Sequence, residues 1–143
     1  MIRIAIVGTG GMANTHARAY ADIKGCKLVA ACDVVPERAR AFAERHGMPH
    51  AFSNLDEMLA EVEFDALSNV TSDAAHAPVS LRAIAAGRHV LCEKPLATNY
   101  PDARRMAAAA KRKGVVSMVN FSYRNSAAIH RAHDMIRRGD IGR

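Results

Sequence analysis

Apolar and polar positions change their spacing repeatedly along the chain. Short apolar runs, typical of buried strands, alternate with longer stretches in which apolar residues recur every three or four positions, as on one face of a helix. The expected strands cover residues 2–7, 27–32, 50–52, 64–70, 89–92 and 115–119, and the expected helices cover residues 11–24, 36–46, 55–62, 73–86, 101–113 and 127–138. This alternation with short connections predicts an α/β fold, a doubly wound parallel (Rossmann) sheet of about six strands with helices on both faces.

Residues at the helix ends support these boundaries. Four glycines each follow an expected helix and precede an expected strand, and glycine tolerates the left-handed conformation in which helices commonly end. They are Gly25, Gly47, Gly87 and Gly114. Asn54 and Glu57 have the spacing of a capping box, and Asn99 or Thr98 can cap the helix that carries Pro101 in its first turn.

The composition is that of one globular domain. The chain has 143 residues, of which 50% are hydrophobic and 24% charged, and this suits a domain with one buried core. No apolar run approaches the roughly 20 residues needed to span a bilayer. The first strand begins almost at Met1, so we expect no signal peptide ahead of it and a cytoplasmic protein.

The net charge of +6 raises the hypothesis of a nucleic-acid partner. The densest basic clusters lie at residues 104–105, 111–113 and 137–138, within or near the ends of expected helices, where cations complement the helix dipole. The chain has no Trp and few Phe or Tyr residues, so no stacking pattern accompanies them. We therefore expect a solvated basic face, with neither nucleic acid nor membrane as a partner.

The cysteines and histidines form no metal-binding pattern. Cys26, Cys32 and Cys92 make no C-x-x-C pair and lie in or beside expected strands, which indicates structural thiols in a reducing compartment. His130 and His133 are spaced to share a helix face, but no third or fourth ligand accompanies them. No metal site is expected.

A glycine-rich loop follows the first expected strand. Residues 8–13 match the G-x-G-x-x-G/A fingerprint between a strand and a helix, the context in which it binds dinucleotides. Gly8 permits the tight turn, Gly10 lets the backbone approach a pyrophosphate, and Ala13 still allows the helix to pack closely on the strand. The helix N-terminus favours phosphate at this point. The cofactor-binding residues expected here are Gly8, Thr9, Gly10, Gly11 and Met12.

Asp33 ends the second expected strand, 20 residues after Ala13. A carboxylate at this place can accept hydrogen bonds from the ribose hydroxyls of adenosine and repels the 2′-phosphate of NADP, so NAD is the expected cofactor. Arg38 lies close by in sequence, and a guanidinium there could accommodate that phosphate instead. The simpler alternative is that the glycines only make a turn and that Asp33 only caps the next helix.

The tripeptide Glu93-Lys94-Pro95 makes the interpretation more specific. It resembles the E-K-P motif of the glucose–fructose oxidoreductase, inositol dehydrogenase and rhizopine catabolism (Gfo/Idh/MocA) family of oxidoreductases. The likeness extends through nearly the whole chain and includes residues 4–10 and 120–124. Residues 71–76 are similar to the family segment T-P-N-x-x-H, although Ser72 and Asp73 replace its Pro and Asn.

The resemblance implies roles for these residues. Lys94 is the catalytic residue, whose ammonium group orients the reacting hydroxyl and stabilises charge on its oxygen during hydride transfer. The other segments end strands of a parallel sheet, so we expect them to converge on the cofactor. The implied cofactor contacts are Thr71, Ser72, His76, Glu93, Lys94 and Pro95, and the implied substrate contacts are Asn120 and Arg124.

Simpler alternatives exist for several of these residues. Glu93 and Lys94 can form an exposed ion pair at the end of a strand. His76 can cap its helix, and Arg124 can tie a loop to its neighbours. The bond that precedes Pro95 is the candidate for a cis peptide.

The expected function is hydride transfer between NAD and a hydroxyl of a sugar, cyclitol or related polyol. Family members have a second α/β domain that supplies an Asp and a His for proton transfer, and residues 139–143 resemble the crossing into it. We expect that domain to be absent here, residues 1–143 to be inactive alone, and the full-length parent to be a homo-oligomer. The competing hypotheses are a non-catalytic NAD(H)-binding or sensing module and a basic nucleic-acid binder.

Overall fold

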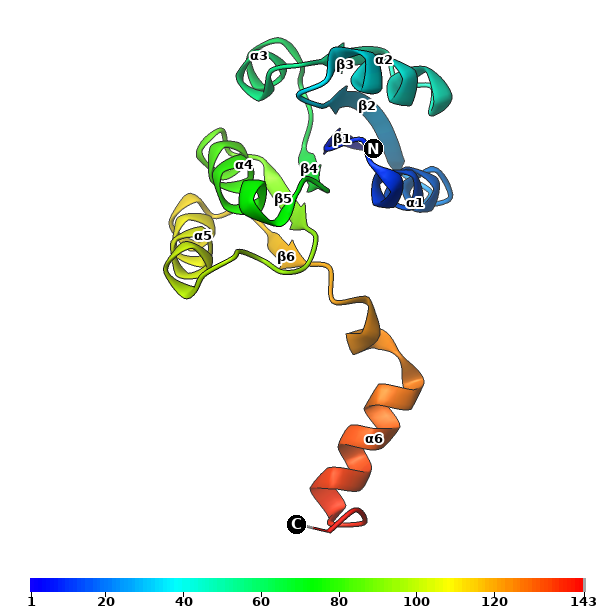
Figure 1. Cartoon of the computed structure of the whole chain (residues 1–143), viewed down its shortest axis with the longest axis vertical. Helices are drawn as coiled ribbons and strands as arrows, with labels where there is room; N and C mark the ends of the chain where they lie inside the picture. The colour runs from blue at the N-terminus through cyan, green and yellow to red at the C-terminus, as the bar shows by residue number, and fades with distance from the viewer. Residues whose placement is uncertain (143) are drawn as a thin grey trace.

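The computed structural model describes residues 1–142, which form one sheet of six parallel strands with helices around it (Figure 1). The strands are β1 (Ile2–Val7), β2 (Cys26–Cys32), β3 (His50–Phe52), β4 (Ala66–Asn69), β5 (His89–Cys92) and β6 (Ser117–Val119). The helices are α1 (Gly11–Ala21), α2 (Pro36–Arg45), α3 (Leu55–Glu61), α4 (Asp73–Ala85), α5 (Tyr100–Lys113) and α6 (Ala127–Arg138), with a 3₁₀ turn η1 (Ser122–Asn125) before α6. The expected Rossmann-type α/β fold is confirmed.

The helix ends agree with the expected caps in most details. Gly47, Gly87 and Gly114 lie at the ends of their helices with φ angles between 64° and 77°, whereas Gly25 also has a positive φ (87°) but lies beyond Asp22, the C-cap of α1. Of the two expected caps of α5, Asn99 is used, and its side chain accepts a hydrogen bond from the Asp102 backbone N–H (2.9 Å). The Asn54 side chain accepts from the Asp56 N–H (2.8 Å), one residue earlier than the expected capping box with Glu57 requires.

The end of α1 differs from the expected boundary. The helix stops at Ala21 rather than Lys24, because the chain turns and Cys26 N–H donates to the Ile23 carbonyl oxygen (3.1 Å). The apolar pattern continues into this turn, and the side chain of Ile23 lies largely exposed at its surface. Periodicity therefore overestimates the length of this helix.

The side chains of β1 alternate between two apolar layers. Ala5 and Val7 pack in a cluster with residues of α3, α4 and α5, whereas Ile6 packs with residues of α1 and α2. Figure 1 shows α1 on one side of the sheet and α4 and α5 on the other. A strand covered on both faces needs apolar residues at successive positions, which explains the short continuous apolar run in the sequence.

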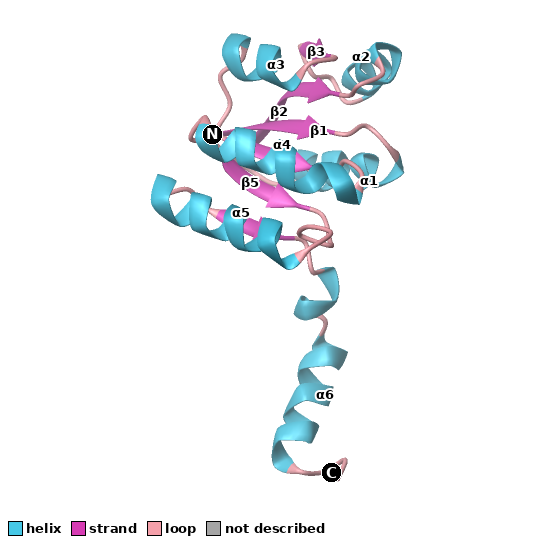
Figure 2. Cartoon of the chain, turned by 60° about the vertical axis from the view of Figure 1, so that its left-hand side comes forward, coloured by secondary structure: helices cyan, strands magenta, loops and turns pink. Residues whose placement is uncertain are grey.

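The order of strands creates a crevice in the middle of the sheet. The order is β3-β2-β1-β4-β5-β6, so the chain runs outward from β1 to β3 and then crosses to β4 on the other side. The loops that follow β1 and β4 therefore leave the sheet in opposite directions. Open α/β sheets bind ligands at such a point, beyond the carboxyl ends of the strands. Figure 2 shows the strands pointing towards this shared edge.

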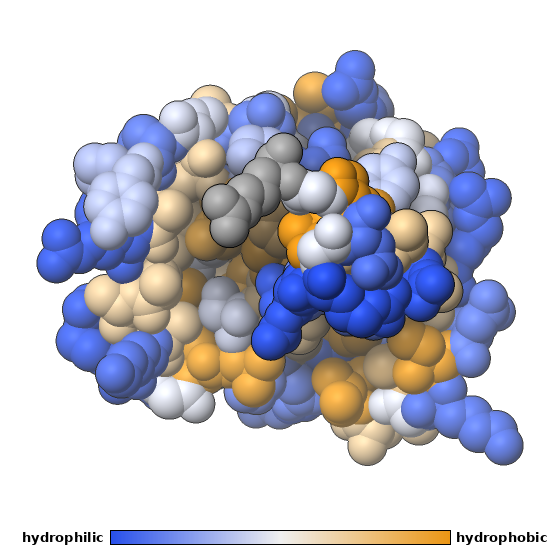
Figure 3. Space-filling model, turned by 90° about the horizontal axis from the view of Figure 1, so that it is seen from below, coloured by the Kyte–Doolittle hydropathy of each residue, from blue (hydrophilic) through white to orange (hydrophobic). Residues whose placement is uncertain are grey.

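The C-terminal helix α6 projects away from the sheet (Figures 1 and 2). None of its residues is buried. Large apolar side chains of this region lie exposed, among them Phe121, Ile129 and Ile136. Figure 3 views the molecule from the side on which α6 projects, and hydrophobic areas lie there among hydrophilic ones. Within residues 1–142, no helix has the length and apolar character that crossing a membrane requires.

An ion pair closes the amino edge of the sheet between β1 and the start of β4. The Arg3 backbone N–H donates to the Asp65 carboxylate (2.7 Å), and the Arg3 guanidinium donates to both of its oxygens (3.0 and 3.2 Å). The same guanidinium also contacts Glu63 (2.9 Å). Hydrogen bonding from Arg3 lowers the pKa of Asp65 to about 2.

We expect Asp65→Asn to lower the free energy of unfolding at neutral pH, by an amount that shrinks in acid. The folded-state pKa of Asp65 is depressed, so its contribution is present above the unfolded value of about 4 and is lost as the pH falls towards 2. Urea unfolding of both proteins between about pH 7 and pH 2.5 measures the difference. A difference that stayed constant with pH would contradict this role of the ion pair.

Candidate cofactor and active site

Five segments singled out in the sequence meet along the carboxyl edge of the sheet. They follow β1, β2, β4, β5 and β6, at residues 8–12, 33, 71–72, 93–95 and 120. Contacts join them across the edge, from the first loop to Asp33 and to Thr71 and from Glu93 to Asn120. The expected convergence of these segments is confirmed.

The glycine loop contains two kinds of glycine. Gly8 has a φ of +85°, and a Cβ placed on it would lie 2.5 Å from the Val70 carbonyl oxygen and 2.8 Å from the Thr71 Cα. Gly10 and Gly11 instead face open space, because a Cβ on either would meet no atom within 4 Å. Gly10 is the N-cap of α1 and no side chain caps this helix. The loop thus leaves room beside the first N–H groups of a helix, as the approach of a phosphate requires.

Asp33 is fixed by hydrogen bonds from both sides. Its Oδ2 accepts from the backbone N–H (2.9 Å) and the hydroxyl (2.8 Å) of Thr9, and its Oδ1 accepts from the Val35 N–H (3.0 Å). Partial burial raises the pKa of Asp33, but these hydrogen bonds and the charge of Arg38 outweigh it and lower the pKa below its ordinary value. The carboxylate is therefore ionised at neutral pH. Arg38 lies exposed in the first turn of α2.

Two pockets lie at this edge of the sheet. One, of about 380 Å³, is lined by Asp33 together with the ends of β1 and β2 and the start of α3. The other, of about 550 Å³, is lined by Met12, Glu93, Lys94 and residues of the segment that leads from Asn120 into α6. Val7, just before the glycine loop, lines the first pocket and Met12, at the end of the loop, lines the second, so a ligand with two halves could reach from one pocket to the other past the loop.

Glu93 is buried and holds three groups together. Its Oε1 accepts from the Asn120 side-chain amide (2.6 Å) and lies 2.9 Å from His16 Nε2, and its Oε2 accepts from the Lys94 backbone N–H (3.1 Å). Burial raises the pKa of Glu93, yet the hydrogen bonds from Asn120, His16 and Lys94 lower it overall. The alternative of an exposed Glu93–Lys94 ion pair is wrong, because the Glu93 side chain is only 10% exposed and contacts the backbone of Lys94.

His76 lies beneath the loops, where it is 1% exposed. Its Nδ1 lies 2.6 Å from the Pro95 carbonyl oxygen, and its Nε2 lies 3.2 Å from the Thr71 carbonyl oxygen. The N-cap of α4 is Ser72 and its helix has no side-chain cap, so His76 is not the cap of its own helix. This placement favours a role in tying two loops together over direct contact with a cofactor. The Lys94–Pro95 bond is cis, as expected.

The remaining singled-out residues lie nearer to solvent. Lys94, Ser72 and Arg124 are exposed, whereas Thr71 and Asn120 are partly buried. The Thr71 hydroxyl donates to the Asn69 side-chain oxygen (2.7 Å). Lys94, Asn120 and Arg124 line the same 550 Å³ pocket. The structure therefore brings the implied catalytic and substrate residues to one place.

Sequence reasoning did not single out His16 and Ser68. His16 lies on the buried face of α1 with Ala13 and Ala17, and its Nδ1 is 2.9 Å from the Ser68 hydroxyl. A histidine at helical spacing within an apolar stripe was the available signal, but this pattern is equally typical of a core position. Its partner Glu93 is 77 residues away in sequence.

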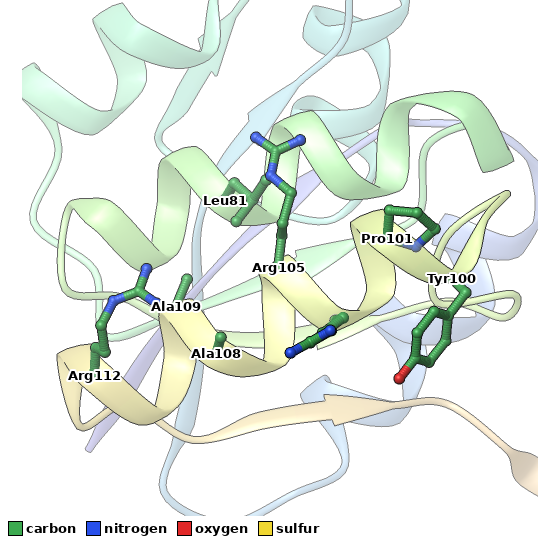
Figure 4. Close-up of a pocket in the computed structure, with 8 residues that line it drawn as sticks. Leu81, Tyr100, Pro101, Arg105, Ala108, Ala109 and Arg112 are labelled. Atoms are coloured by element: carbon green, nitrogen blue, oxygen red, sulfur yellow. The ribbon is translucent and has the colours of Figure 1, made fainter.

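Another pocket, of about 570 Å³, lies on the outer surface formed by α4 and α5 (Figure 4). Its lining residues are Leu81, Tyr100, Pro101, Arg104, Arg105, Ala108, Ala109 and Arg112. Arg105 is already paired with Asp102 (2.9 Å). None of the lining residues belongs to a segment with recognisable chemistry, so no site is assigned there. Among residues 1–142, no group of three or more His, Cys, Asp or Glu side chains is placed to hold a metal ion.

The comparison with known families agrees with this geometry. A family model described as an oxidoreductase family with an NAD-binding Rossmann fold, GFO_IDH_MocA, matches residues 2–121. The chain belongs to this family. The resemblance inferred from Glu93-Lys94-Pro95 and the glycine loop is thereby confirmed, and the chain is an NAD-binding Rossmann domain of the Gfo/Idh/MocA family.

Curated relatives and solved structures of the family cover almost all of the chain. The scyllo-inositol 2-dehydrogenase (NADP(+)) IolU of Bacillus subtilis is 42% identical over 118 residues, which is 82% of this chain and 36% of that protein. The WlbA dehydrogenase from Bordetella pertussis, solved with NADH and UDP-GlcNAcA, is 35% identical with a TM-score of 0.92. The match covers 99% of this chain and 44% of the WlbA chain.

A third match is scyllo-inositol dehydrogenase from Lactobacillus casei, solved with NAD(H) and scyllo-inositol. It is 27% identical with a TM-score of 0.88, and the match covers 99% of this chain and 42% of the Lactobacillus casei chain. The chain therefore spans less than half the length of these relatives.

The two glycines Gly8 and Gly10 should respond differently to the same substitution. Gly8→Ala forces a left-handed non-glycine residue and drives a Cβ into the backbone of Val70, so we expect it to lower the free energy of unfolding by about 2 kcal/mol or more. Gly10→Ala adds a Cβ in open space and only replaces one N-cap residue by a poorer one, so it should lower the free energy of unfolding by about 1 kcal/mol or less. Urea denaturation of the three proteins measures both values, and equal effects would contradict the assignment.

Proposed function

We propose that this chain binds NAD across the glycine loop and belongs to an enzyme that transfers a hydride between NAD and a hydroxyl group of a sugar, cyclitol or related polyol. The observation that carries the proposal is the pair of pockets whose linings include Val7, just before the glycine loop, and Met12, at its end. One contains an ionised carboxylate, and the other contains an exposed lysine and an amide.

The residues around the first pocket fit the adenosine half of the cofactor. The hydrogen bonds from Thr9 and Val35 leave Asp33 partly exposed, and an ionised carboxylate accepts hydrogen bonds from ribose hydroxyls. The pyrophosphate would lie at the start of α1, where Gly10 and Gly11 leave space beside the backbone. The same carboxylate disfavours a 2′-phosphate, so NAD is proposed over NADP.

The choice between the two cofactors depends on two opposing charges. Arg38 is exposed and close enough to Asp33 to lower its pKa, and a guanidinium can also pair with a 2′-phosphate. The relative from Bacillus subtilis is named for NADP(+). Three backbone and side-chain donors hold Asp33 in its ionised form at the end of β2, where the ribose is proposed to lie, and this supports NAD.

The residues around the second pocket fit the nicotinamide half of the cofactor and the substrate that reacts with it. NAD, when bound, supplies the acceptor for a hydride from the carbon that bears the hydroxyl. Lys94 would hold the alcohol oxygen through a charged N–H donor and stabilise negative charge on it as its proton leaves. Asn120 and Arg124 line the same pocket and are proposed to orient the substrate. The names of the relatives, which include inositol dehydrogenases, support a polyol as the substrate class.

Several properties of the complete protein remain predictions. The second domain that supplies an Asp and a His, the inactivity of residues 1–143 alone and the homo-oligomeric parent are proposed from family resemblance. The cytoplasmic location and the absence of nucleic-acid and membrane partners are proposed from the composition and the pattern of apolar and basic residues.

Asp33 should determine both the affinity for NAD and its preference over NADP. We expect Asp33→Asn to weaken NAD⁺ binding by roughly 10- to 100-fold, because hydrogen bonds to a charged group contribute about 1.5–3 kcal/mol. NADP⁺ binding should weaken less or improve, since the repulsion of its 2′-phosphate is removed. Calorimetric titration of the chain with each cofactor measures both.

The control for this titration is Asp22→Asn, which removes an exposed carboxylate in the turn after α1. It should leave both affinities unchanged. Equal weakening of NAD⁺ and NADP⁺ by Asp33→Asn would show that the carboxylate does not contact the ribose.

Lys94 should control turnover in the complete natural gene product. We expect Lys94→Met to lower kcat for oxidation of inositols or sugars by about 100-fold or more, which is typical for loss of a group that assists proton transfer. The rate of NADH formation measures kcat. Lys113→Met, at the far end of α5, is the matched control. Full activity of Lys94→Met would contradict the assignment, and NAD binding without turnover of any polyol would favour a non-catalytic module.

A further inference from the structure

A buried polar cluster connects the helix of the glycine loop to the turn that carries Lys94. It consists of His16 on α1, Ser68 on β4, Glu93 after β5 and Asn120 after β6. The first three are each less than 10% exposed. Polar groups in an otherwise apolar layer are retained when each has a partner, and here each does. The cluster spans three adjacent strands and one helix.

The donors and acceptors of the cluster can be assigned. Glu93 carries a lowered pKa, so it is a carboxylate that only accepts, and His16 donates to it through Nε2–H. His16 Nδ1 then faces the hydroxyl of Ser68. The two oxygens of Glu93 are occupied by His16, by the Asn120 amide and by the Lys94 backbone N–H.

We propose that His16 is a positioning residue that acts through Glu93. Ser68 orients the imidazole, the imidazole holds the carboxylate, and the carboxylate fixes the backbone of Lys94 and the side chain of Asn120. The wall of the 550 Å³ pocket formed by Lys94 and Asn120 thereby keeps a fixed position relative to the glycine loop, since His16 lies one turn after Met12 on the same helix. The expected effect of His16 on cofactor binding rests on the proposed function. Its role in holding Glu93, and through Glu93 the Lys94 backbone and the Asn120 side chain, does not.

The surroundings of Lys94 and Asn120 explain why they need a buried polar cluster to hold them in place. Lys94 is exposed, and the segment from Asn120 through η1 to α6 has no buried residue in its helical parts. Apolar packing therefore does not fix this wall of the pocket. A buried charge with three donors is directional, and it sets the orientation of both Lys94 and Asn120 in a way that apolar contacts cannot.

A matched pair of substitutions isolates the bond to Glu93. His16→Gln places an amide donor near the position of Nε2, whereas His16→Asn reaches only towards Ser68 and lacks a donor for Glu93. His16→Gln therefore keeps a partner for Glu93 and gives up the contact to Ser68, and His16→Asn does the reverse. His89→Asn is the control, because His89 accepts from the Val116 N–H (2.9 Å) at the amino end of β5, away from the site.

The first measurement is amide hydrogen exchange by NMR on the ligand-free chain of 143 residues. In His16→Asn, exchange of the Lys94 amide and the Asn120 side-chain amide should accelerate about 10-fold or more while that of the central strands β1 and β2 stays unchanged. In His16→Gln and His89→Asn it should stay within about 3-fold of wild type. Equal protection of the two amides in all variants, or acceleration throughout the sheet in His16→Asn, overturns the proposal.

The second measurement separates the two halves of the cofactor site. NADH and ADP-ribose are titrated into each variant, since ADP-ribose lacks the nicotinamide. His16→Asn should weaken NADH about 5-fold relative to ADP-ribose and reduce the fluorescence change of bound NADH, and His16→Gln should restore both. An unchanged ratio overturns the proposal. If wild type binds neither ligand, the proposed function fails, and the exchange measurement still decides the role of His16.

Discussion

The position of the glycine loop depends on the absence of a side chain at Gly8. Its backbone runs so close to the end of β4 that a Cβ would lie 2.5 Å from the Val70 carbonyl oxygen. β1 and β4 are the neighbours between which the strand order reverses, so this contact sets how tightly the two diverging loops pack. Thr9, the next residue, is thereby placed to donate to Asp33, and Gly10 to be the N-cap of α1. The positions of Asp33 and of the helix N-terminus, both part of the proposed cofactor site, therefore depend on this one close backbone contact.

Two carboxylates at this edge have a lowered pKa but differ in what their charge does. Glu93 is buried, and its oxygens accept from groups of the chain on three different elements. Asp33 is partly exposed and lines a pocket, so lone pairs remain for a ligand. Although the sequence places both residues just after a strand, burial assigns Glu93 to holding its neighbours together, and the exposed lone pairs of Asp33 fit the recognition role proposed for it.

Much of this arrangement could be predicted from the sequence, and the rest could not for a physical reason. Strands buried on both faces, helix-ending glycines and the loop of residues 8–13 are local patterns, and the structure contains them. The end of α1 was misplaced because the apolar residue Ile23 continues the helical period into a turn. The partners of His16 and His76 are set by tertiary packing. A buried histidine gives the same sequence signal whether its neighbours are carbonyl groups, a carboxylate or apolar side chains.

The two halves of the site therefore differ in how they are stabilised. The pocket around Asp33 is walled by strand ends and by α3, whose buried Leu55 and Met58 anchor it in the core. The pocket around Lys94 is walled on one side by a segment that leaves the sheet at Asn120, where the backbone N–H bonds to Cys92 and the side chain bonds to Glu93. Apolar packing thus fixes the pocket proposed for the adenosine half of the cofactor. In the proposed site, order around Lys94 comes from the buried charge of Glu93, so a change at that charge should alter the geometry around Lys94 while the fold around the glycine loop persists.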